Sequence, residues 1–295
     1  MSFKACLKSM RLRTLPLSMA GIIIGISLAS GVSPLRTGVV ITLITTTALL
    51  QILSNLSNEL GDTLSGTDSA DRQGIHYSIQ DGQMSIAQMK RLIGIVTALC
   101  CISGLAMTLL SFGTLLAAEP LCLLALGAAA IWAAMHYTLG KNPYGYRGLG
   151  DIFVFIFFGL TAVLGAGYVC SHIIRAIWFL PAAAIGCWSI GVLNVNNIRD
   201  MKTDAATRMT IALKLGGHKA RIYQTVLIAA GWVLLAVYSA ISCTEWLQWI
   251  YFITLPLFIR HLRGVWTRSE RALDPMLPML VLSAFITAIL FALTA

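Results

Sequence analysis

Long apolar segments separated by short polar ones are the feature that most constrains how this chain can fold. A spanning helix needs about 20 mostly apolar residues. Hydrophobic residues make up 57% of the chain, whereas they make up about 45–50% of a typical soluble domain. The candidate spans are residues 15–33, 38–57, 92–113, 117–136, 152–170, 176–193, 222–242, 246–259 and 275–294, of which 246–259 is the shortest. The sequence therefore predicts an all-α polytopic membrane bundle, one domain over residues 1–295 with about nine transmembrane helices.

Lysine and arginine are distributed very unevenly among the connecting segments. If the N-terminus is cytoplasmic, all of the 21 basic residues except Arg36 and Arg175 fall on the cytoplasmic side. The cytoplasmic loops of membrane proteins carry an excess of lysine and arginine. We therefore expect a multi-pass protein of the cell (plasma or inner) membrane whose N-terminus is cytoplasmic. The main reason for the net charge of +9 is the preference for lysine and arginine on the cytoplasmic side. As a secondary role, these residues would attract anionic lipid or a diphosphate substrate. No basic helix with interleaved aromatic residues points to a nucleic-acid partner.

An acidic stretch rich in asparagine follows the second apolar segment. Residues 55–72 read NLSNELGDTLSGTDSADR. Its acids are Glu59, Asp62, Asp68 and Asp71. Asn58 and Asp62 share one face if the helix continues through them. Clustered carboxylates repel one another unless a cation joins them, and Mg²⁺ usually takes one or two carboxylates plus substrate phosphates. The stretch therefore favours a Mg²⁺ site for a phosphorylated substrate over a solvated polar loop.

A second stretch of the same kind follows the sixth apolar segment. NELGD in the first stretch and NNIRD at 196–200 share the pattern Asn-x-x-x-Asp, and a further aspartate follows each of them. Asn196, Asp200 and Asp204 have the spacing i, i+4 and i+8, which predicts a single stripe along one helix. Two such motifs on the same side of the membrane predict a pair of facing metal sites for a diphosphate.

The loop after the fourth apolar segment supplies cations on the same side. It reads HYTLGKNPYGYRGLGD and contains Lys141 and Arg147, which could bind a diphosphate or could be ordinary loop residues. Loss of an allylic diphosphate would leave a carbocation that can alkylate an electron-rich ring. Such a cation has to be protected from water, and a cavity inside a helical bundle could provide that protection.

Taken together, these motifs resemble those of the UbiA-type intramembrane prenyltransferases. That family has Asn-Asp-x-x-Asp-x-x-x-Asp after helix two, Tyr-x-x-x-Lys after helix four and Asp-x-x-x-Asp after helix six. Tyr137 and Lys141 match the second pattern. Glu59 stands where the family usually has Asp, and Gly66 stands at the usual position of the third acid. Four stretches are most similar to the menaquinone branch: RLRTLPLS, NELGDTLSGTDSADR, YRGLGDIFVFIFFG and NNIRDMKTDAATRMTIALKLG.

The resemblance implies Mg²⁺-dependent transfer of a polyprenyl group from polyprenyl diphosphate to 1,4-dihydroxy-2-naphthoate at the cytoplasmic side of the bilayer. The implied products are demethylmenaquinol, diphosphate and CO₂. Two alternatives remain open. One is a prenyltransferase for another acceptor, such as 4-hydroxybenzoate or haem. The other is a divalent-cation transporter.

The resemblance also implies a role for individual residues. The implied metal ligands are Asn58, Asp62 and Asp68 for one Mg²⁺ and Asn197, Asp200 and Asp204 for the other, and the four aspartates among them are the implied catalytic residues. Diphosphate binding is expected from Arg72, Lys141 and Arg208, and substrate binding from Asn55, Tyr137 and Arg147.

Overall fold

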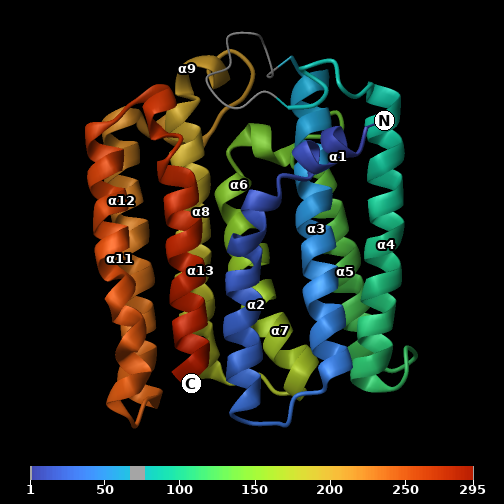
Figure 1. Ribbon diagram of the computed structural model, residues 1–295, viewed down its shortest axis with the longest axis vertical. Helices are drawn as coiled ribbons and strands as arrows, with labels where there is room; N and C mark the ends of the chain where they lie inside the picture. The colour runs from blue at the N-terminus through green and yellow to red at the C-terminus, as the bar shows by residue number, and fades with distance from the viewer. Residues whose placement is uncertain (1, 67–76, 295) are drawn as a thin grey trace. The chain divides into compact units, whose positions relative to one another are not determined.

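The computed structural model describes residues 2–66 and 77–294, and it contains no strand within those ranges. Its helices are shown in Figure 1. In the described residues, eight helical segments are long and apolar enough to cross a membrane. They are Phe3–Ser30, Thr37–Leu64, Ile86–Phe112, Ala118–His136, Gly150–Ser171, Ala176–Arg199, Gly217–Ser242 and Glu270–Thr294. The prediction of an all-α, multi-pass membrane protein is confirmed, and eight of the nine expected spans overlap these segments over most of their length.

The expected span at 246–259 is the exception. This segment is helical, but it divides into a 3₁₀ helix, η5 (Trp246–Thr254), and α12 (Leu255–Thr267). Pro256 lies in the first turn of α12, where its missing N–H costs no helical hydrogen bond. Arg260 and Arg263 follow within two turns and reduce the apolar content of the segment. It is therefore not among the eight helical segments that length and composition select.

The chain divides into two compact units that each combine distant parts of the sequence. Unit 1 comprises Met1–Leu15, Thr37–Gly150 and Lys202–Thr210, and unit 2 comprises Pro16–Arg36, Asp151–Met201 and Ile211–Ala295. The expectation of a single domain stays a prediction. One consequence matters for the site: residues 202–210, at the end of the second motif, belong to the same unit as the first motif.

Unit 1 is built on three long helices, α3 (Thr37–Leu64), α4 (Ile86–Phe112) and α5 (Ala118–His136), with α3 packed against the other two. Its shorter elements are α1 (Phe3–Met10), η1 (Leu12–Thr14), η2 (Tyr144–Arg147) and α9 (Met201–Asp204), whose first residue belongs to unit 2. Leucine and methionine side chains from α3 and α4, including Leu53, Leu56 and Met89, form its buried core. The core fixes the last turns of α3, which carry the first motif.

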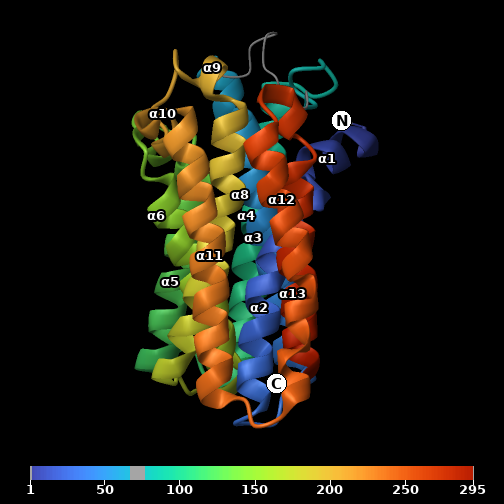
Figure 2. The ribbon, with the colours of Figure 1, turned by 90° about the vertical axis from the view of Figure 1, so that its left-hand side faces the viewer.

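Unit 2 packs around α8 (Phe179–Arg199), which lies against α11 (Gly217–Ser242) and α13 (Met276–Thr294). Figure 2 shows α8 beside α11. The other elements of this unit are α2 (Leu15–Ser30), α6 (Gly150–Val154), the π-helix η3 (Phe155–Thr161), α7 (Ala162–Ser171), η4 (Ala176–Trp178), α10 (Ile211–Leu215), η5, α12 and η6 (Glu270–Leu273). The first residue of α6 belongs to unit 1. Glycine permits α2 to approach α7 closely, because a Cβ on Gly25 would lie 2.3 Å from the Val163 carbonyl oxygen.

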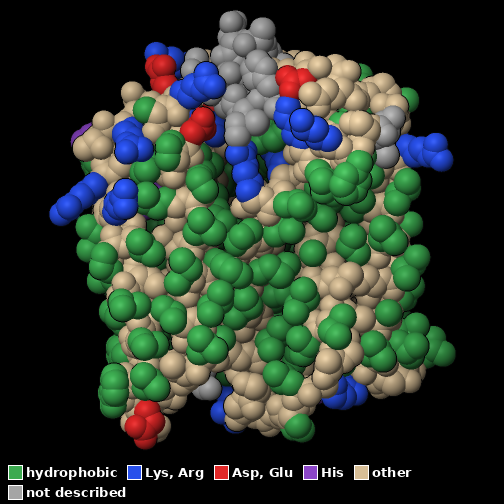
Figure 3. Space-filling view, viewed as in Figure 1, with side chains coloured by type: hydrophobic (Ala, Val, Ile, Leu, Met, Phe, Trp, Pro, Cys, Tyr) green, Lys and Arg blue, Asp and Glu red, His purple; other side chains and the backbone are tan. Residues whose placement is uncertain are grey.

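Many large apolar side chains of the long helices are exposed. Ile102 on α4 is 63% exposed and Leu121 on α5 is 51% exposed. Hydrophobic side chains are spread widely over the face drawn in Figure 3. A soluble protein rarely leaves so much apolar surface uncovered, whereas lipid tails cover it at no cost.

Candidate functional site

The first motif lies on the last two turns of α3. The helix continues to Leu64, so the predicted shared face of Asn58 and Asp62 is confirmed. A turn follows, and Gly66 has a φ of 74°, a left-handed conformation that glycine adopts without strain. Asp68, Asp71 and Arg72 lie outside the described residues, so the roles expected of Asp68 and Arg72 stay predictions.

A single arginine joins the first motif to the end of the second. Arg208 Nη2 lies 2.7 Å from Asp204 Oδ1, and Arg208 Nη1 lies 3.7 Å from Asp62 Oδ1. The side chains of Asp62, Asp204 and Arg208 are only 5%, 1% and 6% exposed. Burial by itself would lower the pKa of Arg208, but the charges of Asp62 and Asp204 outweigh it and leave that pKa raised. Arg208 therefore remains a cation between two buried carboxylates.

Tyr146 on η2 completes this cluster. Its hydroxyl donates a hydrogen bond of 2.8 Å to Asp62 Oδ1 and lies 2.8 Å from the hydroxyl of Ser65. Its ring centroid lies 5.8 Å from Arg208 Cζ, and its carbonyl accepts a hydrogen bond from the Met209 amide. The sequence analysis selected Tyr137, Lys141 and Arg147 from this loop and missed Tyr146, although the aromatic YGYR run was a visible signal.

The other residues predicted in this loop lie in different surroundings. Tyr137 is half-buried, and its carbonyl accepts a hydrogen bond of 3.0 Å from the Gly145 amide. A Cβ on Gly145 would lie 2.5 Å from that oxygen, so the turn requires glycine. Tyr137 also contributes to the raised pKa of Arg208. Lys141 and Arg147 are exposed, as expected of side chains that could meet an incoming anion.

The loop also touches the first motif directly. Thr138 Oγ1 donates a hydrogen bond to the Ser57 carbonyl at 2.9 Å and lies 3.4 Å from Asn58 Oδ1. Gly61 makes this approach possible, since a Cβ there would lie 2.3 Å from Thr138 Oγ1. The contact fixes the α3 face that carries Asn58 and Asp62.

Asn55 and Glu59 hold neighbouring backbone rather than one another. The Asn55 amide donates hydrogen bonds to the Met10 carbonyl (2.8 Å) and the Thr14 hydroxyl (2.9 Å). Its own oxygen accepts one from Gln51. Glu59 Oε1 accepts a hydrogen bond of 2.9 Å from the Ile79 amide. Asn55 therefore anchors the N-terminal segment, and its substrate-binding role stays a prediction.

The second motif ends α8 in unit 2. Arg199 Nε and Nη2 donate to the two carboxylate oxygens of Asp200 at 2.8 and 2.6 Å. The same guanidinium donates to Asp274 Oδ1 at 2.8 Å and to Asn196 Oδ1 at 2.9 Å. Asn197, like Asp200, is buried. This fork is the bidentate geometry in which arginine pairs most strongly with a carboxylate.

The predicted helical stripe through Asn196, Asp200 and Asp204 is wrong. α8 ends at Arg199, and Asp200 has a φ of −94° and a ψ of 7°, outside the helical region. A separate short helix, α9, then carries Asp204. The break places Asp200 with Arg199 in unit 2 and Asp204 with Arg208 in unit 1.

Three of the aspartates expected to bind Mg²⁺ lie beside arginines in the structure. Across residues 2–66 and 77–294, no three His, Cys, Asp or Glu side chains are grouped so as to hold a metal. The carboxylates and amides of both motifs are nevertheless hard oxygen donors of the type that Mg²⁺ prefers. Asp62 and Asp204 share one arginine, and Asp200 is paired with another. Asp62, Asp200 and Asp204 each lie beside an arginine, which supplies the positive charge that a divalent cation would otherwise supply.

Comparison with known proteins relates the chain to prenyltransferases over nearly its whole length. The sequence model of the UbiA prenyltransferase family matches residues 18–285. The 1,4-dihydroxy-2-naphthoate octaprenyltransferase of Escherichia coli is 38% identical over 292 residues, which is 98% of this chain and 94% of that protein. The Haemophilus influenzae protein of the same name is 34% identical over 287 residues, 96% of this chain and 92% of that protein.

Two solved structures are similar in fold. The apo structure of a UbiA homolog from Aeropyrum pernix K1 has a TM-score of 0.74 at 14% identity, over 96% of this chain and 98% of that one. A UbiA homolog from Archaeoglobus fulgidus, bound to DMAPP and Mg²⁺, has a TM-score of 0.62 at 13% identity, over 97% of this chain and 99% of that one.

Proposed function

Because the chain belongs to the UbiA prenyltransferase family, we propose that it transfers a polyprenyl group from a polyprenyl diphosphate to 1,4-dihydroxy-2-naphthoate. The near-full-length similarity to two octaprenyltransferases of that name supports this acceptor. The charged cluster of Asp62, Asp204 and Arg208 is the structural observation that carries the proposal. The two buried carboxylates could bind a divalent cation, and the arginine between them could bind the diphosphate that such a cation accompanies.

The reaction would break the bond between the allylic carbon and the diphosphate oxygen, with the electron pair leaving on the diphosphate. The ring carbon that carries the carboxylate would form the new carbon–carbon bond. Loss of CO₂ would then return an electron pair to the ring and restore its aromaticity, giving demethylmenaquinol. The acceptor needs no outside oxidant or reductant.

Each motif would contribute oxygens to one metal ion. The proposed ligands are Asn58, Asp62 and Asp68 for one Mg²⁺ and Asn197, Asp200 and Asp204 for the other, with the four aspartates as catalytic residues. A bound divalent cation would stabilise charge on the departing diphosphate. The DMAPP and Mg²⁺ in the Archaeoglobus homolog support this assignment.

The chain's own cations and hydroxyls would orient the substrate. Arg208, with Arg72 and Lys141, would neutralise diphosphate oxygens, and its raised pKa keeps it charged at any physiological pH. The Tyr146 hydroxyl would hold Asp62 in one orientation. Asn55, Tyr137 and Arg147 are the proposed substrate-binding residues. The uneven distribution of basic residues supports a cytoplasmic site in the cell membrane.

The test is a prenyl-transfer assay on purified protein in detergent or liposomes. One labelled polyprenyl diphosphate is offered with 1,4-dihydroxy-2-naphthoate, 4-hydroxybenzoate or haem, with Mg²⁺ or with a chelator. We expect a prenylated naphthalene product and released CO₂ only with the first acceptor and Mg²⁺. Transfer to either other acceptor would point to another branch of the family. Mg²⁺ uptake into liposomes without any prenyl donor would instead favour a transporter.

A further inference from the structure

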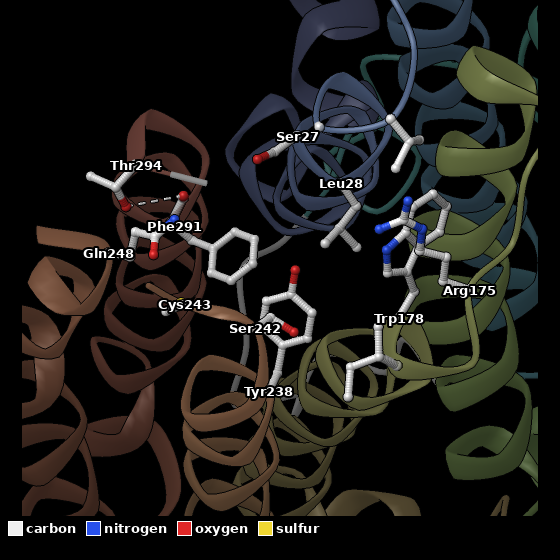
Figure 4. Close-up of a pocket in the computed structure, with 13 residues that line it drawn as sticks. Ser27, Leu28, Arg175, Trp178, Tyr238, Ser242, Cys243, Gln248, Phe291 and Thr294 are labelled. Atoms are coloured by element: carbon white, nitrogen blue, oxygen red, sulfur yellow. Dashed lines mark hydrogen bonds between the residues drawn. The ribbon is translucent and has the colours of Figure 1, made fainter. Parts of the chain in front are cut away.

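A cavity of about 180 Å³ lies in unit 2, where α2 and α11 end and α8 begins (Figure 4). The cavity is large enough for several ordered waters or for a group of phosphate size. Its lining combines polar side chains with aromatic ones, among them Trp178, Tyr238 and Phe291. Nothing in the proposed prenyl transfer uses it.

The cavity is far from the Asn/Asp motif of the same unit. Trp178 directly precedes α8, whereas Asp200 directly follows it. The 21 residues of α8 extend for about 30 Å at 1.5 Å per residue, which is close to the hydrocarbon thickness of a bilayer. The cavity and the motif therefore lie at opposite membrane surfaces.

The charge of the lining favours an anion. Arg175 is the only charged side chain among the described residues that line the cavity. In the described part of the chain it has no acidic partner. Figure 4 shows the Arg175 guanidinium and the Tyr238 hydroxyl directed toward the same space. A guanidinium with a nearby hydroxyl can donate several hydrogen bonds to phosphate oxygens.

A second observation also indicates a missing ligand. Ser27 is only 6% exposed and lines the cavity, yet its hydroxyl has no hydrogen-bond partner within residues 2–66 and 77–294. A buried hydroxyl without a partner is unfavourable, so such groups normally meet a ligand or ordered water. Leu28 and Val32, next along α2 and the turn that follows it, provide apolar surface at the same cavity.

We propose that this cavity binds the phosphate group of a membrane phospholipid, in the leaflet opposite the Asn/Asp motif. Arg175 supplies the main donors, and Ser27 and Tyr238 supply hydroxyls. The aromatic rings face the glycerol and upper acyl region, where Trp and Tyr are typical of membrane interfaces. A phospholipid fits better than free phosphate because apolar and polar side chains line the cavity together.

The test measures lipid binding by native mass spectrometry and by the shift in melting temperature of the protein purified in detergent. The ligands are phosphatidylglycerol, phosphatidylcholine, diacylglycerol and inorganic phosphate. Both phospholipids should bind and stabilise the protein, whereas diacylglycerol and inorganic phosphate should not. Arg175→Gln should weaken phospholipid binding about tenfold or more. Arg175→Lys should give an intermediate loss, because it keeps the charge without the fork.

The matched control is Arg36→Gln, which removes the same charge outside the cavity lining and should bind phospholipid as wild type. Tyr238→Phe keeps the ring and should lose binding by a smaller factor, so it carries the test if Arg175→Gln folds poorly. Undiminished phospholipid binding in Arg175→Gln would overturn the proposal. Equal stabilisation by inorganic phosphate would show a simple anion site and would overturn the lipid assignment.

Discussion

Arg208→Gln is the substitution that tests the charged cluster most directly. The guanidinium lies 2.7 Å from Asp204 Oδ1 and 3.7 Å from Asp62 Oδ1, with all three side chains at most 6% exposed. Removing one partner of a buried ion pair costs about 3–5 kcal/mol, because the remaining charge is left uncompensated. Two carboxylates would remain here, so we expect a loss of stability of about that size without divalent cation.

The same substitution should respond to Mg²⁺ if the carboxylates are metal ligands. Thermal unfolding of the detergent-solubilised variant, followed with increasing Mg²⁺, should show a larger rise in melting temperature than wild type, because the cation replaces the missing charge. Prenyl transfer at saturating Mg²⁺ should fall by about 100-fold, the size seen when a donor that stabilises developing negative charge is removed. Lys90→Gln, which removes an exposed cation from the same unit, is the control and should change neither property.

A double substitution separates the charge effect from lost packing. Asp204→Asn with Arg208→Gln removes both partners of the 2.7 Å pair, so it should recover part of the stability that Arg208→Gln loses. Either of two results would refute the reasoning. One is a wild-type melting temperature for Arg208→Gln without Mg²⁺. The other is a double variant that is less stable by the full sum of the two single changes.

Three further predictions concern the supports of the two motifs. Tyr146→Phe removes the hydrogen bond to Asp62 and should lower prenyl transfer about tenfold with little change in melting temperature; an unchanged rate would show that the hydroxyl does not orient Asp62. Gly61→Ala places a Cβ 2.3 Å from Thr138 Oγ1 and should destabilise the protein, whereas Gly94→Ala, which meets nothing within 4 Å, should not. Asp274→Asn should raise the Mg²⁺ concentration for half-maximal transfer, because Asp200 is then the one carboxylate that forms an ion pair with Arg199 among the described residues; lower stability with unchanged Mg²⁺ dependence would reduce Asp274 to a structural role.

Local patterns in the sequence account for the parts of the structure that were predicted well. Hydrophobic length predicts the spans because each spanning helix satisfies its own backbone and needs no distant partner. Asn58 and Asp62 share a face because α3 continues without a break through both residues. Segment 246–259 is not selected by length and composition, because Arg260 and Arg263 follow shortly beyond its apolar run, and its role as a span stays a prediction.

Long-range contacts were not predictable in the same way. No spacing rule relates Tyr146 to Asp62, because the fold brings the loop after α5 to the end of α3. The break at Asp200 was also missed, since Arg199 folds onto the carboxylate of its own neighbour and the helix ends there. A continuous periodicity in sequence therefore overstated the length of α8.

Two arginines compensate the charge of the buried aspartates in the two motifs. Asp200 is held by Arg199 from within its own motif, while Asp62 and Asp204 share Arg208. A buried carboxylate needs a positive partner at all times, yet a diphosphate can approach only if positive charge is also available to it. In the proposed reaction, each arginine would meet both needs by turning from carboxylate to phosphate oxygens once a bound divalent cation neutralises the carboxylate. Such an exchange would make the Mg²⁺ response of Arg208→Gln the more informative half of that experiment.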